Sequence, residues 1–237
     1  MATPAAFSEK TFFGDAIVGV LPENWIDVSD LRQVPDHQEI FLSPTTLSSL
    51  IIEINERVSR EEVVGSLVDQ QQESFSADGR HANPQAEDIA AAFYHLRDIS
   101  DEGDTMEVIN PLRPVTLGKF SSGPQQLRTV ASAYAGLVSL RRGASVAAPV
   151  AFDGDTAGSS ATGPRLFTHS CHFLLIRLEP QQTDLLVSVN VPHEEFDLRG
   201  DPRGLFREED LASGLLGKLI ETLEIRNWGL FGQSISV

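Results

Sequence analysis

Short apolar runs with alternating side chains predict strands along most of the chain. The clearest strands cover residues 173 to 178 and 184 to 191, where apolar and polar positions alternate in the second run. Because only residues 179 to 182 separate these two runs, we expect them to form an antiparallel hairpin. Further strands are predicted over residues 16 to 21, 39 to 42, 106 to 109 and 130 to 140. The apolar run from 49 to 54 is compatible with either a strand or a helix.

Three segments have helical patterns instead. Residues 207 to 223 form an amphipathic helix whose broad apolar face is made of Leu211, Leu215, Leu216, Leu219, Ile220 and Leu223. Residues 84 to 98 begin with a proline at the first helical position and carry an apolar stripe. A helical turn over 28 to 33 follows Asp27, which can cap it, and must end before Pro35. The pattern therefore predicts an α+β fold, with a mainly antiparallel sheet flanked by helices on both faces.

Two segments without an apolar period interrupt this pattern. Residues 69 to 83 are rich in Gln, Ser, Asp and Gly, and residues 143 to 165 consist almost entirely of small and polar residues with Pro and Val. A chain of 237 residues can bury one substantial core. We therefore interpret residues 1 to 237 as a single domain with mobile insertions at 69–83 and 143–165.

The strongly acidic charge of the chain restricts its partners. The 34 Asp and Glu residues against 18 Lys and Arg give a formal charge of -16, which disfavours nucleic acid and anionic lipid and favours a basic protein partner. The alternative is that the acidic residues only keep the protein soluble. The single cysteine, Cys171, excludes an internal disulfide and suits the reducing interior of a cell. No apolar run has the length needed to cross a bilayer, and no secretory leader is expected.

The sequence motifs of the common enzyme classes are missing. There is no phosphate-binding loop, nucleophile elbow, H-E-x-x-H pair or dinucleotide fingerprint. The run from His169 to His172 could supply metal ligands or a nucleophile with its base, but adjacent strand residues point to opposite faces. We therefore predict no metal, no cofactor and no catalytic activity. One enzyme hypothesis stays open, a site built from distant polar residues around His95, His169 or His172.

The acidic segment from residue 27 to residue 39 contains residues that suit a helix cap and a turn, and one further carboxylate, Glu39, that neither the cap nor the turn requires. Asp27 and Asp30 suit the start of a short helix, and Pro35 with Asp36 predicts a turn. Glu39 follows that turn and has no such local explanation. Because Glu39 lies three residues after Asp36, beyond the rigid turn, the two carboxylates could form an anionic site for Lys or Arg of a partner. The alternative is that both are ordinary exposed acids.

Several sequence blocks share a longer pattern. Phe13-Gly14-Asp15-Ala16 precedes Ile26-Asp27-Val28-Ser29-Asp30-Leu31-Arg32 and then Val34-Pro35-Asp36-His37-Gln38-Glu39. This order is close to F-G-G-A followed by I-D-x-S-x-L-R-x-V-P-D-x-Q-E, although Asp15 replaces the second glycine. Residues 49 to 53, 175 to 178, 182 to 192 and 230 to 232 agree as well, whereas residues 55 to 165 match loosely. In these blocks the sequence resembles the Ran guanine nucleotide release factor family, also called the Mog family.

The resemblance implies both a fold and a function. It implies a helix-flanked antiparallel sheet like that of the photosystem extrinsic subunit family, in a protein that binds the GTPase Ran, promotes nucleotide release and supports nuclear import. In that family the acidic positions of the P-D-x-Q-E block are important for Ran binding, and they correspond to Asp36 and Glu39. The further partner-binding positions carried over are Asp27, Asp30, Arg32, Pro35 and Gln38. The resemblance also implies a location in the nucleus and the cytoplasm.

The proposed partner-binding acids would act on the conformation of Ran. Asp36 and Glu39 capture basic groups on Ran and favour a conformation in which the phosphate and magnesium contacts of its nucleotide are weakened. A non-enzymatic adaptor that escorts another basic protein through the same acidic face is the alternative. We expect a monomer, and complexes with Ran alone or with a further Ran-binding protein are both compatible with the resemblance.

Overall fold

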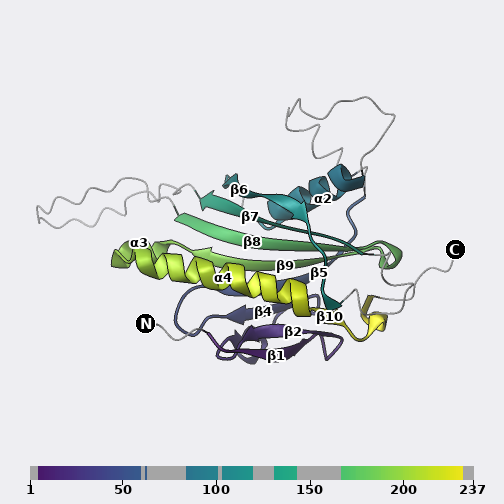
Figure 1. Ribbon diagram of the computed structural model, residues 1–237, viewed down its shortest axis with the longest axis horizontal. Coiled ribbons are helices and arrows are strands. Elements are labelled where there is room, and N and C mark those ends of the chain that lie inside the picture. Colours follow the sequence, from purple (N-terminus) through teal and green to yellow (C-terminus); the bar gives the residue numbers. More distant parts are fainter. Residues whose placement is uncertain are drawn as a thin grey trace, which may run out of the picture.

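Two antiparallel sheets form the framework of the molecule (Figure 1). The computed structural model describes residues 5–59, 62, 84–100, 103–119, 131–142 and 167–231. Within these ranges the predicted α+β class, with helices on both faces of an antiparallel sheet, is confirmed. The insertions predicted at 69–83 and 143–165 lie outside the described residues.

The larger sheet has seven strands in the order β3-β4-β5-β9-β8-β7-β6. Their bounds are β3 Ile26–Asp27, β4 Gln38–Leu42, β5 Ser49–Glu56, β6 Thr105–Pro114, β7 Ala131–Arg142, β8 Phe167–Leu178 and β9 Thr183–Pro192. The predicted hairpin is present, since β8 and β9 pair from His169↔Pro192 to Leu178↔Thr183. It lies at the centre of the sheet, between β5 and β7. The short helix η3, Glu179–Gln181, and left-handed Gln182 close it. The undecided run at 49 to 54 is a strand, since β5 pairs with both β4 and β9.

The smaller sheet has the strand order β1-β2-β10 and was only partly predicted. Its bounds are β1 Phe7–Phe12, β2 Ile17–Pro22 and β10 Glu224–Ile225. The predicted strand at 16 to 21 is confirmed as β2. Strand β1 has mostly polar side chains between its two terminal phenylalanines, and β10 is too short to give a pattern, so neither was predicted from the sequence.

Helices cover the two faces of the larger sheet. On one face lie α3, Glu194–Arg199, and α4, Pro202–Thr222, whose buried leucines join Val187 and Val189 in the main core. On the other face lies α2, Pro84–Asp98, which packs with Phe173, Leu175 and Leu186 in a second core. Because Leu186 and Val187 are adjacent in one strand, the two cores lie on opposite sides of it. Full burial of each leucine contributes about 1.5–3 kcal/mol.

The start of α4 differs from the sequence prediction. The helix begins at Pro202, whereas the apolar pattern predicted a start at residue 207. The side chain of Asp201 accepts a hydrogen bond from Gly204 N at 2.8 Å, and Pro202 occupies the first turn. A cap followed by proline therefore adds an initial turn with too few apolar residues to show in the periodicity.

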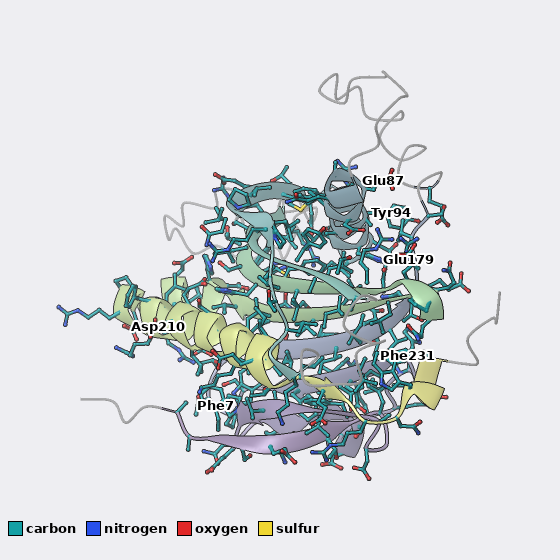
Figure 2. The ribbon with its side chains drawn as sticks, turned by 45° about the vertical axis from the view of Figure 1, so that its right-hand side comes forward. Phe7, Glu87, Tyr94, Glu179, Asp210 and Phe231 are labelled. Carbon is teal, nitrogen blue, oxygen red and sulfur yellow. The ribbon has the colours of Figure 1, made fainter. Side chains whose placement is uncertain are left out.

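The smaller sheet packs on the same face as α4. Phe12 and Leu21 belong to the main core together with the buried face of that helix. Phe7 of β1 lies below α4 in Figure 2, with Lys218 Nζ 5.0 Å from the centre of its ring. Phe12 makes an edge-on contact with Phe41 of β4, with ring centres 5.6 Å apart. The two sheets are thus joined at β4. None of the helices in the described ranges is long and apolar enough to cross a membrane.

Candidate partner-binding site

The predicted acidic segment forms one edge of the larger sheet. Asp27 ends β3 and caps the short helix η1, Val28–Asp30, by accepting hydrogen bonds from Ser29 N at 2.8 Å and Ser29 Oγ at 2.6 Å. The predicted helical turn is therefore present, but it ends at Asp30 instead of residue 33. Asp30 is exposed, and Leu31 is 67% exposed. The capped turn consequently presents an acid and an apolar side chain to solvent.

The predicted proline turn is also present. Gln38 N donates a hydrogen bond to Pro35 O at 2.9 Å, which closes the turn that contains Asp36. Pro35 and Asp36 are both exposed, as is Arg32 before them. Among the described residues, no arginine or lysine forms an ion pair with Asp36 or with Glu39. The carboxylate of Asp36 is therefore open to a partner.

Glu39 has a different environment from Asp36, although it follows the same turn. It is half-buried on β4, and its Oε1 accepts a hydrogen bond from Phe13 N at 2.6 Å. Burial raises the pKa of Glu39, the hydrogen bond from Phe13 lowers it in part, and the negative charge of Asp27 raises it further. One carboxylate oxygen of Glu39 is thus already bonded within the protein.

The seven predicted positions do not all share one face. Asp27 pairs with Phe41 across the β3–β4 ladder, so its side chain lies on the same face as those of Phe41 and Glu39. Gln38 points to the opposite face, where its Nε2 donates to Glu53 Oε1 at 2.8 Å. The structure therefore places Asp27 with Glu39 and separates Gln38 from them, while Asp36 projects from the turn.

A turn that the acidic pattern did not include lies against Glu39. Residues 13 to 16 connect β1 to β2, and Phe13, Gly14 and Asp15 have φ angles of +51°, +59° and +68°. Gly14 and Asp15 are exposed. The only sign of this turn in the sequence is the Phe13-Gly14-Asp15-Ala16 block, which is one of the blocks that carry the family resemblance. Its link to Glu39 spans 26 positions, so no local pattern could indicate it.

The enzyme hypothesis proposed a site around His95, His169 or His172, and the structure places His95 and His172 on opposite faces of the larger sheet. His95 Nε2 bonds to Asp184 Oδ2 at 2.9 Å on the α2 face of the sheet. His172 lies on the α4 face, where its Nε2 bonds to Glu209 Oε2 at 2.8 Å. His172 also lines a cleft of about 550 Å³ between α4 and the β6–β7 pair, together with Arg113 and Ser213. The sheet therefore separates His95 from His172.

The structure described so far is an α+β fold of two antiparallel sheets, with an exposed acidic turn directly before β4, the strand that contacts the smaller sheet. Comparisons with known proteins agree with this architecture. The family model described as Ran-interacting Mog1 protein matches residues 10–192. The crystal structure of the Saccharomyces cerevisiae Ran-binding protein Mog1p superimposes with a TM-score of 0.54, covering 96% of this chain and 100% of the yeast chain at 19% identity.

Curated relatives cover nearly the whole chain. The Ran guanine nucleotide release factor of Homo sapiens is 28% identical over 237 aligned residues, covering 93% of this chain and 94% of the human protein. The factor of Bos taurus is 27% identical and covers 94% of this chain and 96% of the bovine protein. Since the family model spans more than half of the sequence, this chain belongs to the Mog1 family.

Proposed function

We propose that this protein binds the GTPase Ran and promotes release of its guanine nucleotide, in support of nuclear protein import. The observation that carries this proposal is the exposed carboxylate of Asp36, held on a closed proline turn directly before β4. The relatives named as Ran guanine nucleotide release factors support Ran as the partner. The proposed partner-binding set is Asp27, Asp30, Arg32, Pro35, Asp36, Gln38 and Glu39.

The electrostatics of the site suit a basic partner surface. Asp30 and Asp36 are exposed, and within the described residues neither is neutralised by a cation of this chain. Together with the overall charge of -16, they would attract lysine and arginine groups of Ran and accelerate the encounter. Arg32 lies between them in sequence and can pair with an acid of the partner.

Binding can accelerate nucleotide release without any catalytic group. A partner that prefers one conformation of Ran shifts its population by that difference in affinity. Lowering the barrier by about 1.4 kcal/mol accelerates release roughly tenfold. A few charge-assisted hydrogen bonds at the acidic surface can supply such a difference. The protein therefore acts as a regulator of the GTPase, in the nucleus and the cytoplasm, and not as an enzyme.

The test is the release of labelled GTP from Ran after addition of this protein. We expect the wild type to accelerate release and the variant Asp36→Ala plus Glu39→Ala to lose most of the acceleration. The control is Asp210→Ala plus Glu221→Ala, which removes two exposed acids from α4 and leaves the proposed site intact. If the folded site variant accelerates release as well as the wild type, the site is wrongly placed.

The adaptor hypothesis predicts a different result in the same assay. An adaptor would bind a basic protein through the acidic face but leave the release rate of GTP from Ran unchanged. Binding of Ran by the wild type without acceleration would therefore refute the release activity while keeping the binding site.

A further inference from the structure

The carboxylate of Glu39 connects the two sheets. Glu39 belongs to β4 of the larger sheet, and the N–H group that it accepts belongs to Phe13, directly after β1 of the smaller sheet. The neighbouring contact between Phe12 and Phe41 joins the same two strands through their aromatic rings. Glu39 and Phe41 are two positions apart in β4, so both side chains lie on the face that receives the small sheet.

The turn bonded to Glu39 has left-handed backbone angles at three consecutive residues, and Phe13 is the one that least favours them. Phe13 and Asp15 are not glycines, yet both have left-handed backbone angles, on either side of Gly14. Ala16 N donates to Phe13 O at 3.3 Å, and Arg226 N donates to Ala16 O at 2.8 Å. Contacts at both ends therefore hold the turn, and Glu39 provides the one on the side of the acidic surface.

The surroundings of Glu39 suit this bond better than capture of a cation from a partner. Its carboxylate is half-buried and already accepts a short, charge-assisted hydrogen bond. Asp36 is exposed and has no internal cation among the described residues, which are the properties expected of a direct contact. The two acids therefore differ in what they can offer to Ran.

We propose that Glu39 is a positioning residue, which acts on the binding of Ran by fixing the turn of residues 13 to 16 as part of the binding surface. This inference rests on the proposed function. It adds the exposed backbone at Gly14 and Asp15 to the surface presented by Asp27 and Asp36. Asp36 supplies the charge that attracts the partner, whereas the carboxylate of Glu39 accepts the hydrogen bond from Phe13 N.

The first test compares substitutions that separate hydrogen bonding from charge. Glu39→Gln keeps an oxygen that can accept from Phe13 N and removes the negative charge, whereas Glu39→Ala removes both. We expect Glu39→Gln to bind Ran within about twofold of the wild type, and Glu39→Ala to bind about tenfold more weakly. Asp36→Asn, which also removes one charge, should weaken binding. If Glu39→Gln loses as much affinity as Glu39→Ala, Glu39 acts through its charge and the inference is wrong.

A second test disturbs the turn without touching an acid. A valine at Gly14 is strained because the φ angle is +59°, although no atom of the protein lies within 4 Å of the added Cβ. Gly103 offers a matched control, with a φ of +93° and open space around it, next to β6 at the opposite edge of the larger sheet. We expect Gly14→Val to weaken Ran binding about as much as Glu39→Ala, and Gly103→Val to bind like the wild type.

The outcomes distinguish this inference from the proposed function. All affinities are measured well below the unfolding temperature of each variant, so that a general loss of stability does not affect them. Wild-type affinity in Gly14→Val, or equal losses in Gly14→Val and Gly103→Val, would refute the role of the turn while leaving Ran binding intact. No binding of Ran by the wild type would refute the proposed function and this inference together.

Discussion

Asp36 and Glu39 are three positions apart in sequence, but their carboxylates have different environments. The sequence predicted the cap of Asp27 and the turn at Pro35 because both depend on neighbouring residues. It did not predict the bond between Glu39 and Phe13, which depends on the packing of two sheets. Local chemistry therefore identifies the exposed acid, and only the tertiary structure shows what the second acid contacts.

Glu209 gives a residue-scale prediction that depends on pH. Burial raises the pKa of Glu209, but hydrogen bonds from His172, His193 and Ser170 lower it by more than burial raises it. The resulting pKa is about 2. A lowered pKa means that ionised Glu209 stabilises the fold above the ordinary value of 4.5, and that this contribution is lost as the pH falls towards the folded value. Since a quarter of the side chain is exposed, we expect Glu209→Gln to lower the unfolding free energy at neutral pH by about 1–2 kcal/mol.

Urea denaturation of the wild type and of Glu209→Gln at about pH 7 and about pH 3 measures this contribution. The difference between the two proteins should shrink at the lower pH, because Glu209 of the unfolded wild type then binds a proton that the folded protein does not. A difference that is the same at both pH values would show that the ionisation of Glu209 does not stabilise the fold.

At the scale of elements, the alternation and the helical period of apolar residues predicted the central strands and the long helices but not most of the strands at the sheet edges. The alternation in β9 placed Leu185, Val187, Val189 and Val191 on one face, and all of them lie in the main core. The edge elements β1, β3 and β10 were missed, since polar or two-residue strands carry no such pattern. The position of α2 also depends on contacts distant in sequence.

A buried ionic network fixes α2 on the larger sheet. Arg177 of β8 donates to Asp184 Oδ1 at 3.0 Å and to Asp88 Oδ1 at 2.8 Å, and Asp184 also bonds to His95. Asp88 and His95 belong to α2. Removing one partner of such a network leaves buried charges without compensation. The network thus connects the helix to the central hairpin of the sheet.

Arg177→Ala should therefore destabilise the protein by about 3–5 kcal/mol and increase hydrogen exchange of the α2 amides. Arg141→Ala is the control, because Arg141 and its partner Glu107 are more than half exposed and such pairs contribute at most about 1 kcal/mol. Denaturant unfolding and hydrogen exchange of both variants provide the measurement. Equal destabilisation by the two substitutions would contradict the structural role of the network.

At the scale of the whole molecule, the seam between the sheets brings an acidic edge next to a strained turn. The sequence pattern gave the α+β class and the acidic segment, and the resemblance gave the family. The contact of the β1–β2 turn with β4 could not be predicted, because it depends on the packing of the two sheets. Nor could the third strand of the smaller sheet, since β10 pairs with β2 from the other end of the described chain. The residue after β10 also contacts this turn, since Arg226 N donates a hydrogen bond to Ala16 O.

The most direct test of the central claim is the affinity of Ran for the wild type and for Asp36→Asn at about 50 mM and about 300 mM salt. If the exposed carboxylate contacts a basic group, Asp36→Asn should bind about tenfold more weakly at low salt, and its affinity should depend less on salt than that of the wild type. Equal affinities and equal salt dependence would contradict the account.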